Sequence, residues 1–140
     1  MFNVDLETMN ITMHRGDTGS FKLAASRESG DAWTEDDRLL FTIKDQNNVV
    51  VIQRFYRLDD QYDLGDGKVL IEFHNDDTDS LENGMYSVEA RFVISPVWSG
   101  TAPTARCVDA LTAGVRMVEG SIVRTKIQST LEINDIYGEV

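Results

Sequence analysis

Acidic side chains gather in the middle of the sequence, where their oxygen atoms could bind a cation. Residues 59–82 contain nine acidic side chains and one basic side chain. Carboxylates on loops supply the oxygen ligands that Ca²⁺ prefers. A calcium site is therefore one interpretation of this segment, and its candidate ligands are Asp76, Asp77 and Asp79.

The spacing of these acids does not match the calcium loop of EF-hand proteins. In a loop that begins at Asp77, Leu81 stands where an oxygen ligand is needed and Glu82 stands where glycine is needed. The alternative is that the carboxylates are solvated and keep the protein soluble. We favour this alternative, and we expect neither a metal nor another cofactor.

The residues that commonly carry catalysis are scattered and match no motif. Glu72 and Glu89 fall on the polar side of alternating segments, which is typical of a solvent-facing surface rather than of a glycosidase acid pair. His14 and His74 occupy polar positions of the same kind. Cys107 has no CxxC partner and is typical of a small buried apolar side chain. We therefore expect no catalytic residue and no enzyme activity.

Trp33 and Trp98 lie in segments with the composition of loops, which allows two interpretations. Exposed aromatic rings on a β-sandwich can stack on sugar rings, which would indicate a carbohydrate-binding module. We favour the other interpretation, in which both side chains cap the open ends of the sandwich.

Length and composition narrow the class of protein. The chain has 140 residues, of which 41% are hydrophobic, and a net charge of −11. This length fits a single domain over residues 1–140, with a core at 8–133 and flexible ends at 1–7 and 134–140. The acidic balance argues against a nucleic-acid partner, and the longest aliphatic run, at 49–52, is too short to span a membrane.

Apolar and polar residues alternate along most of the chain, which is the period of β-strands. The alternation is clear at positions 9–14, 21–25, 39–44, 68–74 and 86–94. The segment 115–133 reads as one long strand or as two strands broken near Gly120. The pattern predicts an all-β fold, an immunoglobulin-like antiparallel β-sandwich of about seven to nine strands. The side chains expected in its core are Phe21, Leu23, Phe41, Ile43, Ile71, Phe73, Tyr86, Val88 and Phe92.

One short segment predicts how the chain enters a strand. Leu81, Gly84 and Tyr86 have the order of a tyrosine corner, in which the tyrosine hydroxyl bonds to the backbone a few residues upstream. The expected acceptors are backbone groups of Asp77 or Thr78, and Gly84 suits the positive φ angle of a tight corner. The alternative is that Tyr86 is an ordinary half-buried strand residue.

Some apolar residues fall on the polar phase of the predicted strands and would face outward. The interface candidates are Leu40, Leu70 and Val93, together with one of the pairs Val50/Ile52 or Val49/Val51. If these side chains converge, they form an apolar patch of the kind that marks a protein interface. Edge strands offer a second route, by pairing with a neighbouring chain. Alternatively, loops or the segment 134–140 cover these residues within one monomer.

Several segments share a familiar order and spacing. They are His14 to Leu23, Leu39 to Lys44, Gly65 to Phe73, Asp77 and Thr78 through Leu81 with Gly84 and Tyr86, and Gly120-Ser121-Ile122-Val123. Together they resemble the N-terminal domains of the upper baseplate proteins of tailed phages, over residues 8–133.

The resemblance implies a non-enzymatic structural component of a phage or prophage tail or baseplate, with an immunoglobulin-like sandwich as an assembly or adaptor module. It implies other virion or tail proteins as partners, and a homo-oligomer or ring in the assembled particle. The implied location is the virion, with the bacterial cytoplasm during assembly. The alternative function is an immunoglobulin-like carbohydrate-binding module that recognises cell-surface glycans.

Overall fold

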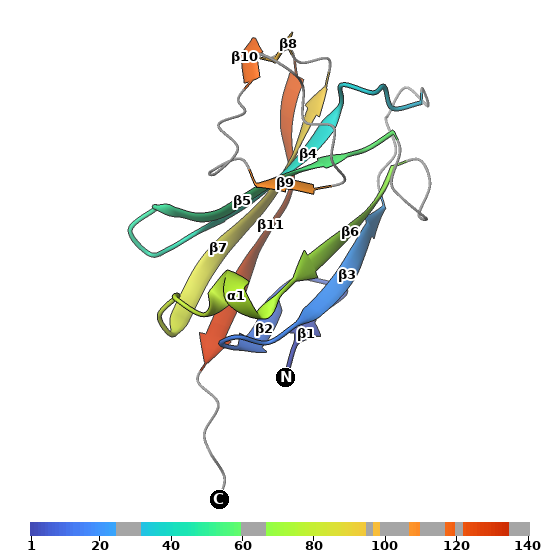
Figure 1. Ribbon diagram of the computed structural model, residues 1–140. Helices are drawn as coiled ribbons and strands as arrows, with labels where there is room; N and C mark the ends of the chain where they lie inside the picture. Colours follow the sequence, from blue (N-terminus) through green and yellow to red (C-terminus); the bar gives the residue numbers. More distant parts are fainter. Residues whose placement is uncertain are drawn as a thin grey trace, which may run out of the picture.

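The protein is built almost entirely of β-strands (Figure 1). The computed structural model describes residues 1–24, 32–59, 67–94, 97–98, 107–109, 117–119 and 122–134. The strands are β1 (Asn3–Val4), β2 (Ile11–His14), β3 (Gly19–Ala24), β4 (Arg38–Lys44), β5 (Val50–Arg57), β6 (Lys68–Phe73), β7 (Gly84–Ile94), β8 (Val97–Trp98), β9 (Cys107–Asp109), β10 (Met117–Glu119) and β11 (Ile122–Asn134). A single helical turn, α1 (Asn75–Thr78), connects β6 to β7.

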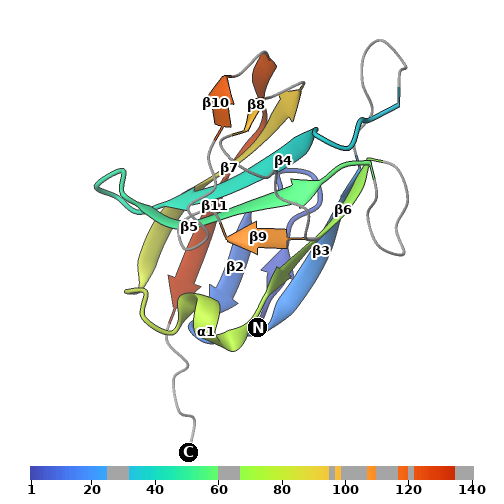
Figure 2. The same ribbon diagram turned by 45° about the horizontal axis from the view of Figure 1, so that its top comes forward.

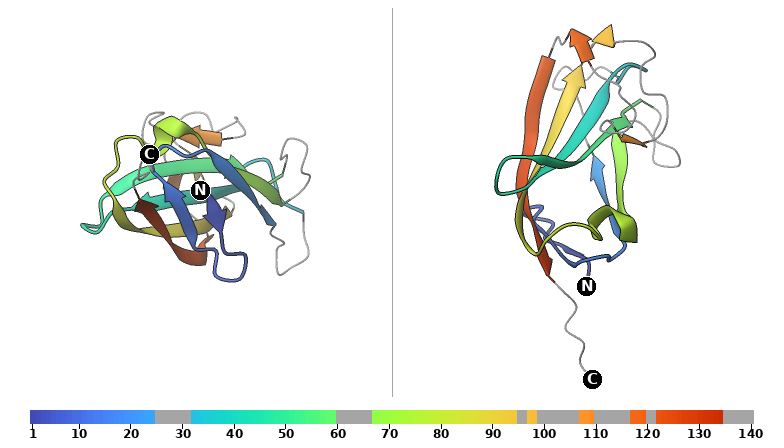
Figure 3. Two further views of the ribbon diagram at one scale, coloured as in Figure 1. Left: turned by 90° about the horizontal axis from the view of Figure 1, so that it is seen from below. Right: turned by 60° about the vertical axis from the view of Figure 1, so that its left-hand side comes forward.

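The strands form two layers, which confirms the predicted all-β sandwich. The large sheet has the order β1-β2-β11-β7-β4-β5-β9, and the small sheet pairs β3 with β6. A further pair, β10 with β8, extends one end of the molecule. The right-hand view of Figure 3 shows the blue and lime strands of the small sheet as a layer apart from the large sheet.

The sandwich is mixed rather than purely antiparallel, which corrects the prediction. β2 runs parallel to β11, with Ile11 opposite Leu131 and Met13 opposite Ile133. All four side chains are buried between the layers. Side chains alternate between the two faces of a strand whether it runs parallel or antiparallel to its neighbour. The sequence pattern therefore indicates which side chains face inward but does not indicate the direction of the strand.

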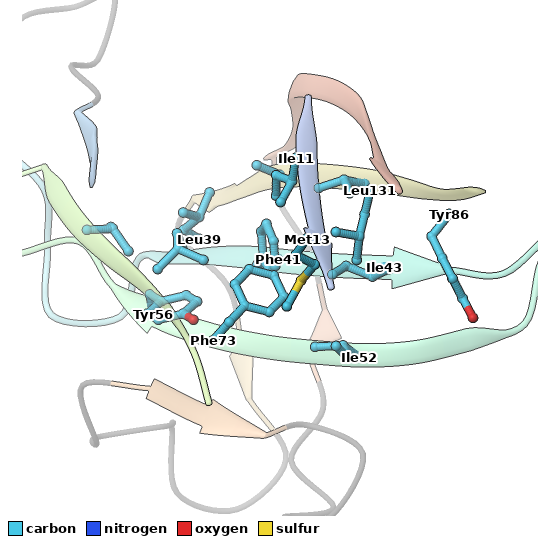
Figure 4. Packing of buried hydrophobic residues seen from close by; sticks show 14 of the residues in the cluster. Ile11, Met13, Leu39, Phe41, Ile43, Ile52, Tyr56, Phe73, Tyr86 and Leu131 are labelled. Atoms are coloured by element: carbon cyan, nitrogen blue, oxygen red, sulfur yellow. The ribbon is translucent and has the colours of Figure 1, made fainter. Parts of the chain in front are cut away.

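The core fills the space between the two sheets (Figure 4). Of the predicted core residues, those on β4 and β6 and two on β7, Tyr86 and Val88, are buried, while Phe21, Leu23 and Phe92 are half-buried against the same cluster. Phe41 on β4 makes edge-to-face contacts with Phe73 on β6 and Phe21 on β3, with ring centroids 6.2 and 6.5 Å apart. These three rings therefore join the large sheet to both strands of the small sheet.

The tyrosine corner is present at the start of β7. The hydroxyl of Tyr86 donates a hydrogen bond of 2.6 Å to the carbonyl oxygen of Glu82. The prediction of Asp77 or Thr78 as the acceptor was wrong, because the chain turns at Gly84 with a φ of 141° and the Tyr86 hydroxyl reaches the carbonyl oxygen of Glu82. The corner is therefore shorter than predicted.

Replacing Tyr86 with phenylalanine removes this buried hydrogen bond. We expect the Tyr86→Phe variant to lose about 1 kcal/mol of unfolding free energy at neutral pH, measured by urea unfolding. Burial raises the pKa of the Tyr86 phenol, and the Glu82 and Asp45 carboxylates raise it further. Because an unfolded phenol titrates near about pH 10, this stabilisation is complete below that pH and declines as the pH rises above it. The difference in unfolding free energy between wild type and variant should become smaller in alkaline solution, and a constant difference would contradict this account.

The N-terminal segment, for which a flexible end at 1–7 is predicted, carries a strand that packs on the sandwich. β1 pairs with β2, and the ring of Phe2 lies 5.6 Å from that of Phe73. A side chain at Gly19 would meet the Phe2 ring at 2.2 Å, so only glycine leaves room for it. At the other end Asn134 still belongs to β11, and residues 135–140 lie outside the described part.

An arginine joins the two layers at their edge. Arg54 lies on β5 opposite Phe41 and therefore projects from the inner face of the large sheet. Its guanidinium donates to the carbonyl oxygen of Glu72 on β6 at 2.7 Å and to the carboxylate of Asp77 in α1. Burial acts to lower the pKa of the Arg54 guanidinium, but the hydrogen bonds and charge interactions with Asp77 and Tyr56 together outweigh burial and raise that pKa.

Candidate functional site

The candidate calcium ligands do not come together as a cluster in the structure. Asp77 accepts hydrogen bonds from the Arg54 guanidinium and from the backbone N–H of His74, the latter at 2.7 Å. Its carboxylate therefore caps α1 and is already paired with a positively charged side chain. Asp76 and Asp79 are exposed on either side of it. Among the described residues, no group of three or more His, Cys, Asp or Glu is placed to hold a metal ion. Asp60, Asp63 and Asp66 of the acidic segment lie outside the described residues.

Val93 does not face solvent, which corrects its assignment as an outward interface residue. It does lie on the outer face of the large sheet, but its side chain is 1% exposed. Arg38 stands opposite Val93 on β4 and is equally buried, with its guanidinium held by the carbonyl oxygens of Glu35 and Asp37. The long arginine side chain therefore fills the space beside Val93 on this face.

Leu40 and Leu70 are half-buried and lie on different layers, so the three candidates do not form one patch. Leu40 is on the outer face of the large sheet opposite Phe55, and Leu70 is on the outer face of the small sheet opposite Lys22. At the start of β5 a register shift opposite Lys44 turns both Val51 and Ile52 towards the core. Val49, which precedes β5, is the exposed member of the pair Val49/Val51, with 55% of its surface exposed.

Trp33 is a core residue. Its side chain is 8% exposed, and its ring stacks on that of Phe92 with centroids 5.7 Å apart. This placement agrees with the capping interpretation and removes Trp33 as a sugar platform. The side chains of Trp98 and Cys107 lie outside what the structure describes.

The histidines and glutamates singled out in the sequence make surface contacts. The Nε2 atom of His74 lies 3.5 Å from the Oε2 atom of Glu72, and both side chains are well exposed. Glu89 lies 2.9 Å from the Nε atom of Arg91 on the outer face of the large sheet. His14 is half-buried on β2, away from these pairs in the sheet order.

A polar groove lies beside the tyrosine corner, between the β4–β5 turn and the start of β7. One part of it has a volume of about 270 Å³ and is lined by residues of both turns. Its polar side chains are Asp45, Gln46, Asn47, Ser80, Glu82 and Asn83. Met85, at 45% exposure, adds an apolar surface, and the groove continues past it to Ser87 and Thr130. Side-chain amides both donate and accept hydrogen bonds, so this groove offers polar contacts to a hydroxyl-rich ligand.

The small sheet has an edge that pairs with no strand among the described residues. β3 pairs with β6 alone, and in Figures 1 and 2 it is the outermost strand of that layer. Ser20, Lys22 and Ala24 are exposed, whereas the alternate residues Phe21 and Leu23 are half-buried. Sequence reasoning predicted open edges in general. It had no means to identify β3, because pairing partners are set by the whole topology.

The opposite edge of the small sheet is bound by other groups near the C-terminal end of β6. The Arg54 guanidinium donates to the carbonyl oxygen of Glu72, and the N–H of His74 donates to Asp77. The backbone N–H and C=O groups of the even-numbered residues of β6 are therefore directed away from β3. In an antiparallel pair the two strands alternate between hydrogen-bonded and non-bonded positions. Ser20 and Lys22, which stand opposite Glu72 and Leu70, therefore direct their own N–H and C=O groups to the open edge of β3.

Comparison with protein families, curated proteins and solved structures finds no match to this chain. No helix within the described ranges has the length and apolar character needed to cross a membrane. The fold and the geometry above therefore define the described part of the chain as an all-β sandwich with an open strand edge at β3 and a polar groove beside the tyrosine corner.

Proposed function

We propose that the protein is a non-enzymatic structural component of a phage or prophage tail or baseplate, and that it acts as an assembly module. The observation that carries this proposal is the open edge of β3 in the small sheet of the two-layer sandwich. Exposed N–H and C=O groups along a strand edge are a template for pairing with another chain. The proposed partners are other proteins of the particle, and the chain takes part in an oligomer or ring there.

The acidic side chains support a structural role. Asp17, Asp45 and Asp77 each accept a backbone N–H and thereby close a turn. Carboxylates held in this way position the loops between strands. The resemblance of residues 8–133 to baseplate domains supplies the setting, which is the virion after assembly in the bacterial cytoplasm.

Labelling of particles tests the proposal. Antibodies against this chain, coupled to gold, would be applied to phage particles released from cells that carry the gene. We expect label at the tail or baseplate in electron micrographs, and particles from a strain in which the gene is deleted serve as the control. Purified particles that contain none of this chain, by labelling and by mass spectrometry, would overturn the proposal.

The polar groove favours a second candidate function, the recognition of cell-surface glycans. Its amide side chains around the exposed Met85 suit the hydroxyl groups and apolar faces of a sugar. Binding to a glycan array should then be weakened in Gln46→Ala and retained in Lys68→Ala, which lies on the small sheet. A wild-type protein that binds no glycan on the array would remove this candidate.

A further inference from the structure

The open edge of β3 has the chemistry to bind one extended segment of a partner protein. We propose that this segment adds to the small sheet as a third strand, with a carboxylate opposite Lys22 and apolar side chains on either side of that carboxylate. The inference rests on the proposed assembly role and names the partner that the same edge would take.

The backbone supplies the first part of the recognition. Ser20 and Lys22 direct N–H and C=O groups outward, while Phe21 and Leu23 exchange theirs with Ile71 and Val69 of β6. A strand placed beside β3 would satisfy these outward groups without disturbing the existing pair.

The inner face supplies apolar contacts. Phe21 and Leu23 are half-buried, and they line a narrow crevice together with Met9 and Phe41. In the added strand, the two residues on either side of the carboxylate point to the inner face and lie next to Phe21 and Leu23. Apolar side chains at these two positions would cover the crevice and remove the exposed parts of both residues from water.

The outer face supplies the charge. Lys22 is exposed on this face, opposite Leu70 of β6. A residue directly opposite Lys22 would lie about 5 Å away between Cβ atoms, where opposite charges stabilise the pair and like charges destabilise it. A carboxylate therefore fits this position of the partner.

The same charges disfavour a second copy of this chain. In a symmetric antiparallel pairing centred on Lys22, the two lysines would stand opposite each other. Each copy also carries a net charge of −11, which adds repulsion between them. The partner is therefore a different protein whose segment is not acidic overall, with one carboxylate among apolar and basic residues.

A short peptide tests this edge directly. The probe is Lys-Ser-Val-Glu-Val-Ser-Lys, and the control probe has lysine in place of glutamate. In ¹⁵N-labelled full chain, we expect saturable shifts in the amide signals of residues 19–24 and 68–73, and slowed exchange of the Ser20 and Lys22 amides. The control probe should bind about three- to fivefold more weakly.

Two variants separate the backbone from the charge. Lys22→Pro removes an outward N–H and should cost at least tenfold in affinity, because proline is tolerated on an edge strand but cannot donate to an added one. Lys22→Glu should reverse the preference between the two probes. The Lys68→Pro variant, with its backbone on the opposite edge, is the matched control and should bind as wild type does.

Three results would overturn the inference: shifts that map to another face, binding unchanged in Lys22→Pro, or a dimer of the chain alone that Lys22→Pro disrupts. The particle-labelling result does not depend on the peptide. Labelled tails without peptide binding would support the assembly role and exclude the β3 edge as the binding site. Unlabelled particles would exclude the assembly role, whatever the result with the peptide.

Discussion

Replacing Phe41 with alanine is expected to lower the unfolding free energy by about 3–5 kcal/mol, a large part of the about 5–15 kcal/mol available to a domain. The ring is 1% exposed, and it touches the rings of Phe73 and Phe21 across the gap between the sheets. Alanine would remove these contacts and leave a cavity that strands on both sides can fill only in part. Urea unfolding followed by circular dichroism measures the loss.

Two further variants frame this result. Phe41→Leu keeps most of the apolar volume and should lose less than Phe41→Ala, so it remains measurable even if the alanine variant does not fold. Met85→Ala, at 45% exposure on the opposite face of β7, should stay within about 0.5 kcal/mol of wild type. A loss of under about 1 kcal/mol for Phe41→Ala would show that the two sheets do not pack through this ring.

The sequence predicted the strands and the core well, because alternation reports which face of a strand each side chain lies on. Phe41, Ile43, Ile71 and Phe73 are buried where the period of two places them. The break near Gly120 also separates two strands, β10 and β11. Strand direction was beyond reach, since the parallel pairing of β2 with β11 changes no inward position.

The outward residues were predicted less well, for a physical reason. Alternation divides side chains between two faces, but it does not say what lies beside each residue on a face. Val93 is on the outer face as expected and is nevertheless buried next to Arg38. Leu40 and Leu70 lie on outer faces of separate sheets, which local sequence cannot distinguish. Arg54 was missed because its partners, Glu72 and Asp77, are far along the chain.

The Arg54→Met variant is expected to lose about 2–3 kcal/mol of unfolding free energy, the second large effect. Methionine keeps the apolar stem but removes the charge that satisfies Asp77 and the carbonyl oxygen of Glu72. The two side chains are only 12% and 15% exposed, so water replaces the lost partner poorly. A fully buried pair broken on one side costs about 3–5 kcal/mol, and the remaining exposure of this pair reduces that value.

A double-mutant cycle identifies the source of this loss. Asp77→Asn keeps an oxygen for the His74 N–H and removes the charge, so it tests the ion pair with the helical turn left capped. The double variant Arg54→Met/Asp77→Asn should lose less than the sum of the two single variants, by about 1–2 kcal/mol, because removing both charges leaves neither one buried without its partner. Additive losses would show that Arg54 stabilises the sandwich through its stem or through Glu72, independently of Asp77. Since the pair is shielded from solvent, the coupling should persist in 1 M NaCl, where the Debye length falls to about 3 Å and exposed ion pairs are screened.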